Sequence, residues 1–247
     1  MELEPLTTDE LAPVSRGRRA RALIIVLLVA FGWPLLNSTL IFIFVGRSVK
    51  PTGTSNATAA PGYWNILAIV YMLGCLAFLV WMLRRQRRTL RDIGLSFSWK
   101  DIPRSLLLFL VSYAALYIAS LIALYGYFFA TGRLLDLRSK NLELLNLNIS
   151  LVSILIILIN PFFEELLARA YLMTELDFLS GRPLIAVLVS AGFQASYHLY
   201  QGVIPMFLIF ALFLVYSIYF VRRKRILPII LAHLYMDLIG LFLYFRN

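Results

Sequence analysis

Residues 149–169 read ISLVSILIILINPFFEELLAR, an apolar stretch that ends with two adjacent glutamates and an arginine. A run of about 20 apolar residues is long enough to cross a bilayer as a helix. A charge at the bilayer centre costs at least about 2.5–3.5 kcal/mol, so each one needs a partner, a water-filled cavity or a function. Glu164, Glu165 and Arg169 therefore mark both a membrane helix and a candidate site.

The same apolar pattern recurs along the chain. Of its 247 residues, 61% are hydrophobic and only 15% are charged, and the mean hydropathy is +0.82. These values lie outside the range of soluble globular domains. The sequence predicts an all-α fold, a polytopic transmembrane bundle of about seven helices, near residues 22–46, 63–83, 105–130, 149–178, 183–200, 203–221 and 227–245. The first run follows an arginine cluster but is too long for a signal-peptide core, so we expect it to remain as a helix.

Basic residues are distributed unequally between the two sides of this bundle. The side that holds the N-terminus carries Arg16, Arg18, Arg19, Arg21, Arg84, Arg85, Arg87, Arg88, Arg91, Lys100, Arg104, Arg182, Arg222, Arg223, Lys224 and Arg225. The other side carries Arg47, Lys50, Arg133, Arg138, Lys140 and Arg246. Because the richer side is normally cytoplasmic, we expect a cytoplasmic N-terminus in a multi-pass protein of the cell membrane. Membrane orientation accounts for the net charge of +10, so we expect no nucleic-acid partner.

The chain divides into three expected parts: a mobile cytoplasmic tail at 1–21, two helices with a basic loop at 22–88, and a core at 89–247. The single cysteine, Cys75, lies in an apolar run. It rules out a disulfide framework and a cysteine metal site.

Three apolar segments contain ionisable residues. The fourth has Glu164, Glu165 and Arg169, the fifth has His198, and the seventh has His233 and Asp237; these are the only two histidines of the chain. A lone histidine can simply join helices by hydrogen bonds. Three segments that each bring polar groups to the bundle interior instead form the pattern of a site for acid–base chemistry.

The spacing of these residues predicts two pairs. Glu165 and Arg169 are four apart on one helical face, and could form a structural ion pair. Glu164 is rotated by about 100° from Glu165, without an obvious partner on its own helix, which favours a functional role. His233 and Asp237 are also four apart, so the carboxylate can orient the imidazole. We predict that Arg169 pairs with Glu165, and that Glu164, His198 and His233 line one cavity.

With these residues the chain resembles the CAAX protease and bacteriocin-processing (CPBP, or Abi) family of intramembrane peptidases. The motifs are Glu-Glu-x-x-x-Arg, Phe-x-x-x-His and His-x-x-x-Asn/Asp, each on its own helix, and the first and last match Glu164, Glu165, Arg169, His233 and Asp237. The second departs from the pattern, because Gln194 stands four residues before His198 and the phenylalanine is Phe193. The phrase Thr89–Leu95 also resembles the family's lead-in, so the resemblance covers roughly residues 89–245.

The resemblance implies an intramembrane endopeptidase, similar to CAAX prenyl protease 2. Glu164 and His198 would activate a water molecule, while His233 and Asp237 would stabilise the oxyanion. Because a carboxylate repels an oxyanion, Asp237 would act through His233 or in its protonated form. The substrate would be a membrane-associated peptide or protein, of the CAAX type or the bacteriocin type.

Two mechanisms stay open for such a site. Glu164, His198 and His233 would suit Zn²⁺, which takes three N or O ligands in catalytic sites and leaves a position for water. Without a metal, Glu164 would be the general base. The cofactor is therefore either Zn²⁺ or none.

The depths of the two histidines present a geometric problem. Counted from the arginine-rich side at 1.5 Å per residue, His198 lies about 22 Å deep and His233 about 9 Å. We expect the turn Tyr200-Gln201-Gly202 to lie inside the protein, where irregular backbone is tolerated and could bring the histidines together.

Other classes of membrane protein use the same residues. Buried Glu, His and Asp also serve transporters and proton relays, although no internal repeat is evident in this chain. A non-catalytic immunity or scaffold protein could retain the site and act by binding. Only an activity measurement separates this last alternative from an enzyme.

Overall fold

A computed structural model describes residues 15–45, 62–133 and 151–246 of the chain. Within these ranges there are helices and no strands: α1 (Arg16–Leu40), α2 (Gly62–Arg85), α3 (Asp101–Thr131), α4 (Leu151–Glu164), α5 (Leu172–Ser180), α6 (Pro183–Ser196), α7 (Val203–Arg223) and α8 (Leu227–Arg246). The chain runs without a break from α4 through the π-helix η5 (Glu165–Tyr171) into α5. The described ranges thus hold seven continuous helices, and the predicted all-α class is confirmed. Most of the predicted tail, residues 1–14, lies outside the described residues.

Local sequence signals set several of the helix ends. The Ser15 hydroxyl accepts a hydrogen bond from the Arg18 N–H (3.4 Å) at the start of α1. Pro183 is the first residue of α6, a position where the missing N–H costs nothing. Gly132 and Gly181 follow α3 and α5 with φ of 67° and 65°, the left-handed conformation that ends many helices.

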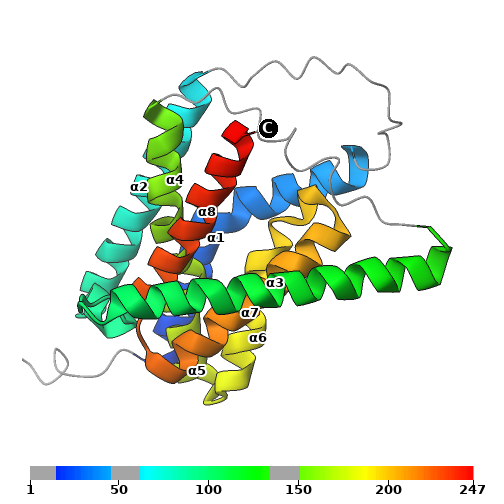
Figure 1. Ribbon diagram of the computed structural model, residues 1–247. Coiled ribbons are helices and arrows are strands. Elements are labelled where there is room, and N and C mark those ends of the chain that lie inside the picture. Colours follow the sequence, from blue (N-terminus) through cyan, green and yellow to red (C-terminus); the bar gives the residue numbers. More distant parts are fainter. Residues whose placement is uncertain (1–14, 46–61, 134–150, 247) are drawn as a thin grey trace, which may run out of the picture.

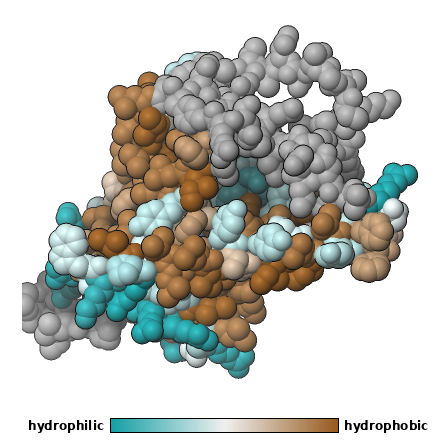
Figure 2. Space-filling view, in the orientation of Figure 1, coloured by the Kyte–Doolittle hydropathy of each residue, from teal (hydrophilic) through white to brown (hydrophobic). Residues whose placement is uncertain are grey.

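Four helices are long and apolar enough to cross a membrane: Arg16–Phe44, Tyr63–Arg85, Asp101–Thr131 and Val203–Arg223. Large apolar side chains are exposed along them, and Figure 2 shows this apolar surface with hydrophilic residues collected mainly towards its lower edge. A surface of this kind needs lipid as its solvent. The chain is therefore an integral membrane protein. The apolar helices Pro183–Ser196 and Leu227–Phe242 are shorter.

The helices enclose the segment that carries the two glutamates (Figure 1). All seven residues of η5 are buried, and α1, α6 and α7 pack against it. α2 lies beside α4, and α3 crosses in front of α7 and α8, on which it packs. The core thus lies around the candidate site.

A clamp joins the loop before α3 to the turn between α7 and α8. Gly94 has φ of 95°, and a Cβ there would lie 2.7 Å from the Lys224 carbonyl oxygen, so only glycine fits. The Ile226 N–H donates to the Gly94 carbonyl (3.0 Å). Arg225 donates to both oxygens of the fully buried Asp101, at 3.0 and 2.5 Å. This hydrogen bonding raises the pKa of Arg225.

Candidate active site

The glutamates lie where the α-helix changes to a wider helix. Pro161 has no N–H, so the hydrogen-bond ladder of α4 is interrupted just before Glu164. The seven-residue π-helix η5 begins at Glu165. Short π-helical segments are rare and occur frequently at functional sites. The backbone itself therefore marks this segment as unusual.

The predicted ion pair between Arg169 and Glu165 is confirmed. The Arg169 Nη1 atom donates to Glu165 Oε2, and both side chains are fully buried. α7 supplies further partners, because Arg169 also donates to the Ser217 hydroxyl (3.3 Å) and to the Phe213 carbonyl (3.4 Å). Glu165 thus has its charge neutralised within the bundle.

Glu164 has partners of a different kind. Asn160 Nδ2 donates to Oε1 and Gln194 Nε2 donates to Oε2, each at 3.2 Å. The expectation that Glu164 lacks a partner on its own helix is wrong: Asn160 is four residues earlier and lies on the same face. Both donors are neutral amides, and within the described residues Glu164 forms no ion pair with lysine or arginine. The two amides stabilise the negative charge of Glu164 by hydrogen bonds but do not neutralise it.

Gln194 lies at the centre of the network, although sequence reasoning did not assign it a role. Its Nε2 donates to Glu164 and also to Glu165 Oε1 (3.2 Å), while its Oε1 accepts from Arg169 (2.5 Å). The side chain is fully buried in α6. Two features of the sequence could have indicated this role: Gln194 stands where the family motif has phenylalanine, and a glutamine in an apolar helix needs hydrogen-bond partners.

His233 in α8 lies between two carboxylates. Its Nδ1 is 2.8 Å from Glu165 Oε1, and its Nε2 is 3.7 Å from Asp237 Oδ1. A carboxylate bound to arginine can only accept hydrogen bonds, so Nδ1 carries a proton. Asp237, the predicted partner of His233, lies beyond hydrogen-bond distance at 3.7 Å. Glu165 is the residue that orients the imidazole ring.

His198 does not lie within a helix as expected from the segment 183–200. α6 ends at Ser196, and the 3₁₀ turn η6 (Leu199–Gln201) follows His198. His198 Nδ1 is 2.9 Å from the Gln194 carbonyl oxygen, which can only accept, so Nδ1 carries a proton and, in the neutral imidazole, Nε2 has the free lone pair. This tautomer leaves Nε2 able to accept a proton.

The turn after His198 lies at the edge of the bundle, which corrects the expectation that it lies inside. Tyr200 is 40% exposed. Ser38 of α1 holds the turn, accepting from the Tyr200 N–H (2.9 Å) and donating to the Ser196 carbonyl (3.5 Å). These contacts satisfy the irregular backbone.

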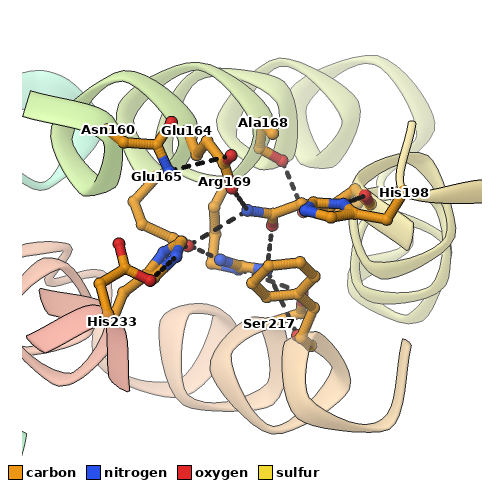
Figure 3. A network of polar contacts seen from close by, with 12 residues as sticks. Asn160, Glu164, Glu165, Ala168, Arg169, His198, Ser217 and His233 are labelled. Atoms are coloured by element: carbon orange, nitrogen blue, oxygen red, sulfur yellow. Dashed lines mark hydrogen bonds and ion pairs between the residues drawn. The ribbon is translucent and has the colours of Figure 1, made fainter. Parts of the chain in front are cut away.

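The polar residues of the three predicted segments converge in one network (Figure 3). Gln194 connects Glu164, Glu165 and, through its carbonyl, His198. The two histidines lie at opposite ends of the network in Figure 3, and the Phe213 ring centre is 6.1 Å from one imidazole and 5.9 Å from the other. A single cavity lined by Glu164, His198 and His233 stays a prediction.

The three residues that would bind a metal if one were used, Glu164, His198 and His233, are not arranged as a metal site. Among the described residues, no group of three His, Cys, Asp or Glu side chains could hold a metal ion. Gln194 contacts Glu164 and, through its carbonyl, His198, whereas His233 binds Glu165. The described arrangement therefore does not fit the Zn²⁺ ligand set.

The geometry defines a class of protein: a helical membrane protein with an acid–base network buried in its bundle. Residues 146–239 match the family model described as type II CAAX prenyl endopeptidase Rce1-like, which confirms the family resemblance over the segment that contains all three motifs. The family is one of membrane proteases. Neither the curated proteins nor the solved structures contain a match to this chain.

Proposed function

We propose that the chain is an intramembrane endopeptidase that hydrolyses a peptide bond in a membrane-associated peptide or protein of the CAAX type or the bacteriocin type. The family match over residues 146–239 supports the reaction class. The buried acid–base network supports the location of the reaction. The substrate and the residue roles are part of the proposal.

The observation that supports the proposal most directly is that the adjacent carboxylates of Glu164 and Glu165 have different kinds of partner. Glu165 is neutralised by Arg169, whereas Glu164 accepts from the amides of Asn160 and Gln194 and forms no ion pair with lysine or arginine among the described residues. A carboxylate without an ion pair retains its ability to take a proton from water. Glu164 is thus the base, and Glu165 positions Arg169 and His233.

The proposed reaction begins with water held between Glu164 and His198. The water oxygen attacks the scissile carbonyl carbon, and Glu164 accepts the proton, with the free Nε2 of His198 as a second acceptor. Collapse of the tetrahedral intermediate breaks the C–N bond, and the proton passes to the leaving amine. This sequence needs only water and the two residues.

His233 would stabilise the oxyanion. Its Nδ1 proton is directed to Glu165, so donation to an oxyanion requires a second proton, on Nε2. Asp237 Oδ1, 3.7 Å from that atom, is the group placed to hold or supply the proton. Asp237 therefore acts through His233.

We also propose the membrane topology that the basic residues predict. The N-terminus would face the cytoplasm, in a multi-pass protein of the cell membrane whose partners are lipid and a peptide substrate. The proposed core is residues 89–247, with the two preceding helices as an added part. Cysteine accessibility on intact cells, tested at the ends of α2 and α3, would measure this orientation.

The test is cleavage by purified Glu164→Gln protein in lipid vesicles. Glutamine keeps the shape of the side chain but cannot accept the proton, so the rate should fall by about 10²–10⁴. The probes are a fluorescent CAAX peptide with a prenyl group and the same peptide without one. The matched control is Asp177→Asn, which alters a carboxylate in the exposed pair with Lys224 and should leave the rate unchanged.

The alternative functions, a proton relay and a non-catalytic scaffold or immunity protein, predict different results in this experiment. Retained cleavage in folded Glu164→Gln protein would refute the proposed base. A pH-dependent ion flux in the wild type that is lost in this variant, without cleavage in either, would identify a proton relay. Absence of cleavage of both probes by the wild type, together with binding of one of them, would favour a scaffold or immunity protein.

A further inference from the structure

Two adjoining cavities lie on the outside of the bundle, away from the network of Glu164. The first, of about 350 Å³, is bordered by apolar residues of α2, the loop after it, α4 and η5, among them Leu76, Leu79, Leu158, Phe162 and Leu166. The second, of about 440 Å³, is bordered by Arg84, Arg88, Arg91 and Thr89 together with apolar residues. Val80 and Leu90 border both, so the two cavities lie side by side.

The basic cavity has an excess of positive charge. Arg88 binds the buried Glu175, but that carboxylate is already bound by Arg19 at 2.6 and 2.9 Å. Within the described residues, neither Arg84 nor Arg91 forms an ion pair. The nearest acid along the chain, Asp92, accepts from the Thr89 N–H (2.6 Å) and hydroxyl (2.9 Å). Two guanidinium groups are therefore left for an external anion.

The combination specifies the chemistry of the ligand. Arginine binds phosphate oxygens through paired N–H groups, and basic pockets beside membrane helices recognise anionic lipid headgroups. An apolar cavity that faces the bilayer accepts an acyl chain through close van der Waals packing, because lipid tails and leucine side chains are equally apolar. We propose that the two cavities form one site for an anionic phospholipid, with its phosphate at Arg84 and Arg91 and an acyl chain beside Leu158. This inference does not depend on the proposed peptidase activity.

Two other anions fit the site less well. A free phosphate would occupy the basic cavity but leave the apolar one unused. The segment 1–14 carries Glu2, Glu4, Asp9 and Glu10 beside Leu3, Leu6 and Leu11, but fixing a chain segment in the site costs backbone conformational entropy that a lipid does not lose. The position of a basic cavity directly beside an apolar one therefore favours a molecule with one charged end and one apolar end.

The test counts lipids retained by the purified full chain in native mass spectrometry. The probes are phosphatidylglycerol and phosphatidylcholine with identical acyl chains, and inorganic phosphate. The wild type should prefer phosphatidylglycerol, and the double variant Arg84→Gln/Arg91→Gln should bind it at least about tenfold more weakly. Leu158→Trp, which fills the apolar cavity, should weaken retention of the same lipid.

The matched control is Arg222→Gln/Arg223→Gln, which removes two exposed arginines from the end of α7. It should retain the preference. Equal retention of the two lipids, or equal losses in the test and control variants, would overturn the proposal. So would competition by inorganic phosphate with no effect of Leu158→Trp, which identifies a phosphate site. Phosphatidylglycerol binding that appears only after deletion of residues 1–14 would show that the acidic tail is the occupant.

Discussion

The bundle contains two clusters of arginine and glutamate with opposite excess charge. In the interior, one guanidinium, Arg169, serves a region that holds Glu164, Glu165 and Asp237. At the end of the bundle, one carboxylate, Glu175, is shared by Arg19 and Arg88. The first cluster retains an excess of negative charge, while the second retains an excess of positive charge. Arginine–glutamate contacts thus occur in two settings, one with carboxylates in excess and one with guanidinium groups in excess.

The two clusters also differ in how far they are removed from solvent. Arg169 and Glu165 are both fully buried, whereas the side chains of Arg19 and Arg88 are 13% and 16% exposed beside a buried Glu175. A fully buried pair that loses one partner leaves an uncompensated charge. A pair at the edge can recover water or a second arginine. Substitutions of Arg169 and of Arg19 therefore compare a fully buried ion pair with one at the edge of the bundle.

The largest stability effect should come from Arg169→Met. It leaves Glu165 and Gln194 without their common partner inside the bundle, and loss of a buried partner costs about 3–5 kcal/mol. Arg19→Met should cost less, about 0.5–3 kcal/mol, because Arg88 still binds Glu175. The measurement is the free energy of unfolding in mixed micelles. A greater loss for Arg19→Met would reverse the comparison between the clusters.

A smaller effect is expected from Gln194→Met, which keeps the volume but removes three hydrogen bonds to charged side chains. Leaving buried polar groups unsatisfied costs about 1–3 kcal/mol. Cleavage should fall through kcat more than through KM, because Glu164 loses the donor that orients it. Gln194→Glu separates the two roles: it retains an acceptor for Arg169 but removes the donor. If kcat is unchanged in both variants, Gln194 has only a structural role.

The smallest effect on activity should come from Asp237→Asn. Its oxygen is 3.7 Å from His233 Nε2, so no tight hydrogen bond is lost, and the amide can itself donate to an oxyanion. Cleavage should stay within about tenfold of the wild type, equivalent to about 1.4 kcal/mol. The pH–rate profile is measured in parallel. A loss as large as that of Glu164→Gln would mean that Asp237 itself takes part in the proton transfer.

Much of the fold was predictable because the bilayer imposes long apolar runs on the sequence. The expected segments 63–83 and 203–221 agree closely with α2 and α7, since each ends at a basic cluster. The segment 183–200 was predicted too long: its apolar character continues to His198, but the backbone turns after Ser196. Hydropathy reports the surroundings of a residue and does not report its backbone conformation.

The residues of the candidate network were predictable, but their contacts were not; their roles stay a prediction. Glu164, His198 and His233 stood out because ionisable groups in apolar segments are costly. The partners chosen by each group depend on how helices face one another, which one sequence does not reveal. Thus His233 binds Glu165 more closely than its neighbour Asp237, and Ser217 of α7 joins Arg169 without any motif to indicate it.

The clamp between Asp101 and Arg225 has a consequence for how the chain is made. The two residues are 124 positions apart, and Asp101 is fully buried in the finished protein. Synthesis runs from the N-terminus, so α3 leaves the ribosome long before Arg225 exists. Until then Arg104, three residues later in α3, is the arginine within reach of Asp101 (3.4 Å in the finished protein). Closure of the clamp then waits for the last helical hairpin, which makes completion of the C-terminal part the event that seals the bundle.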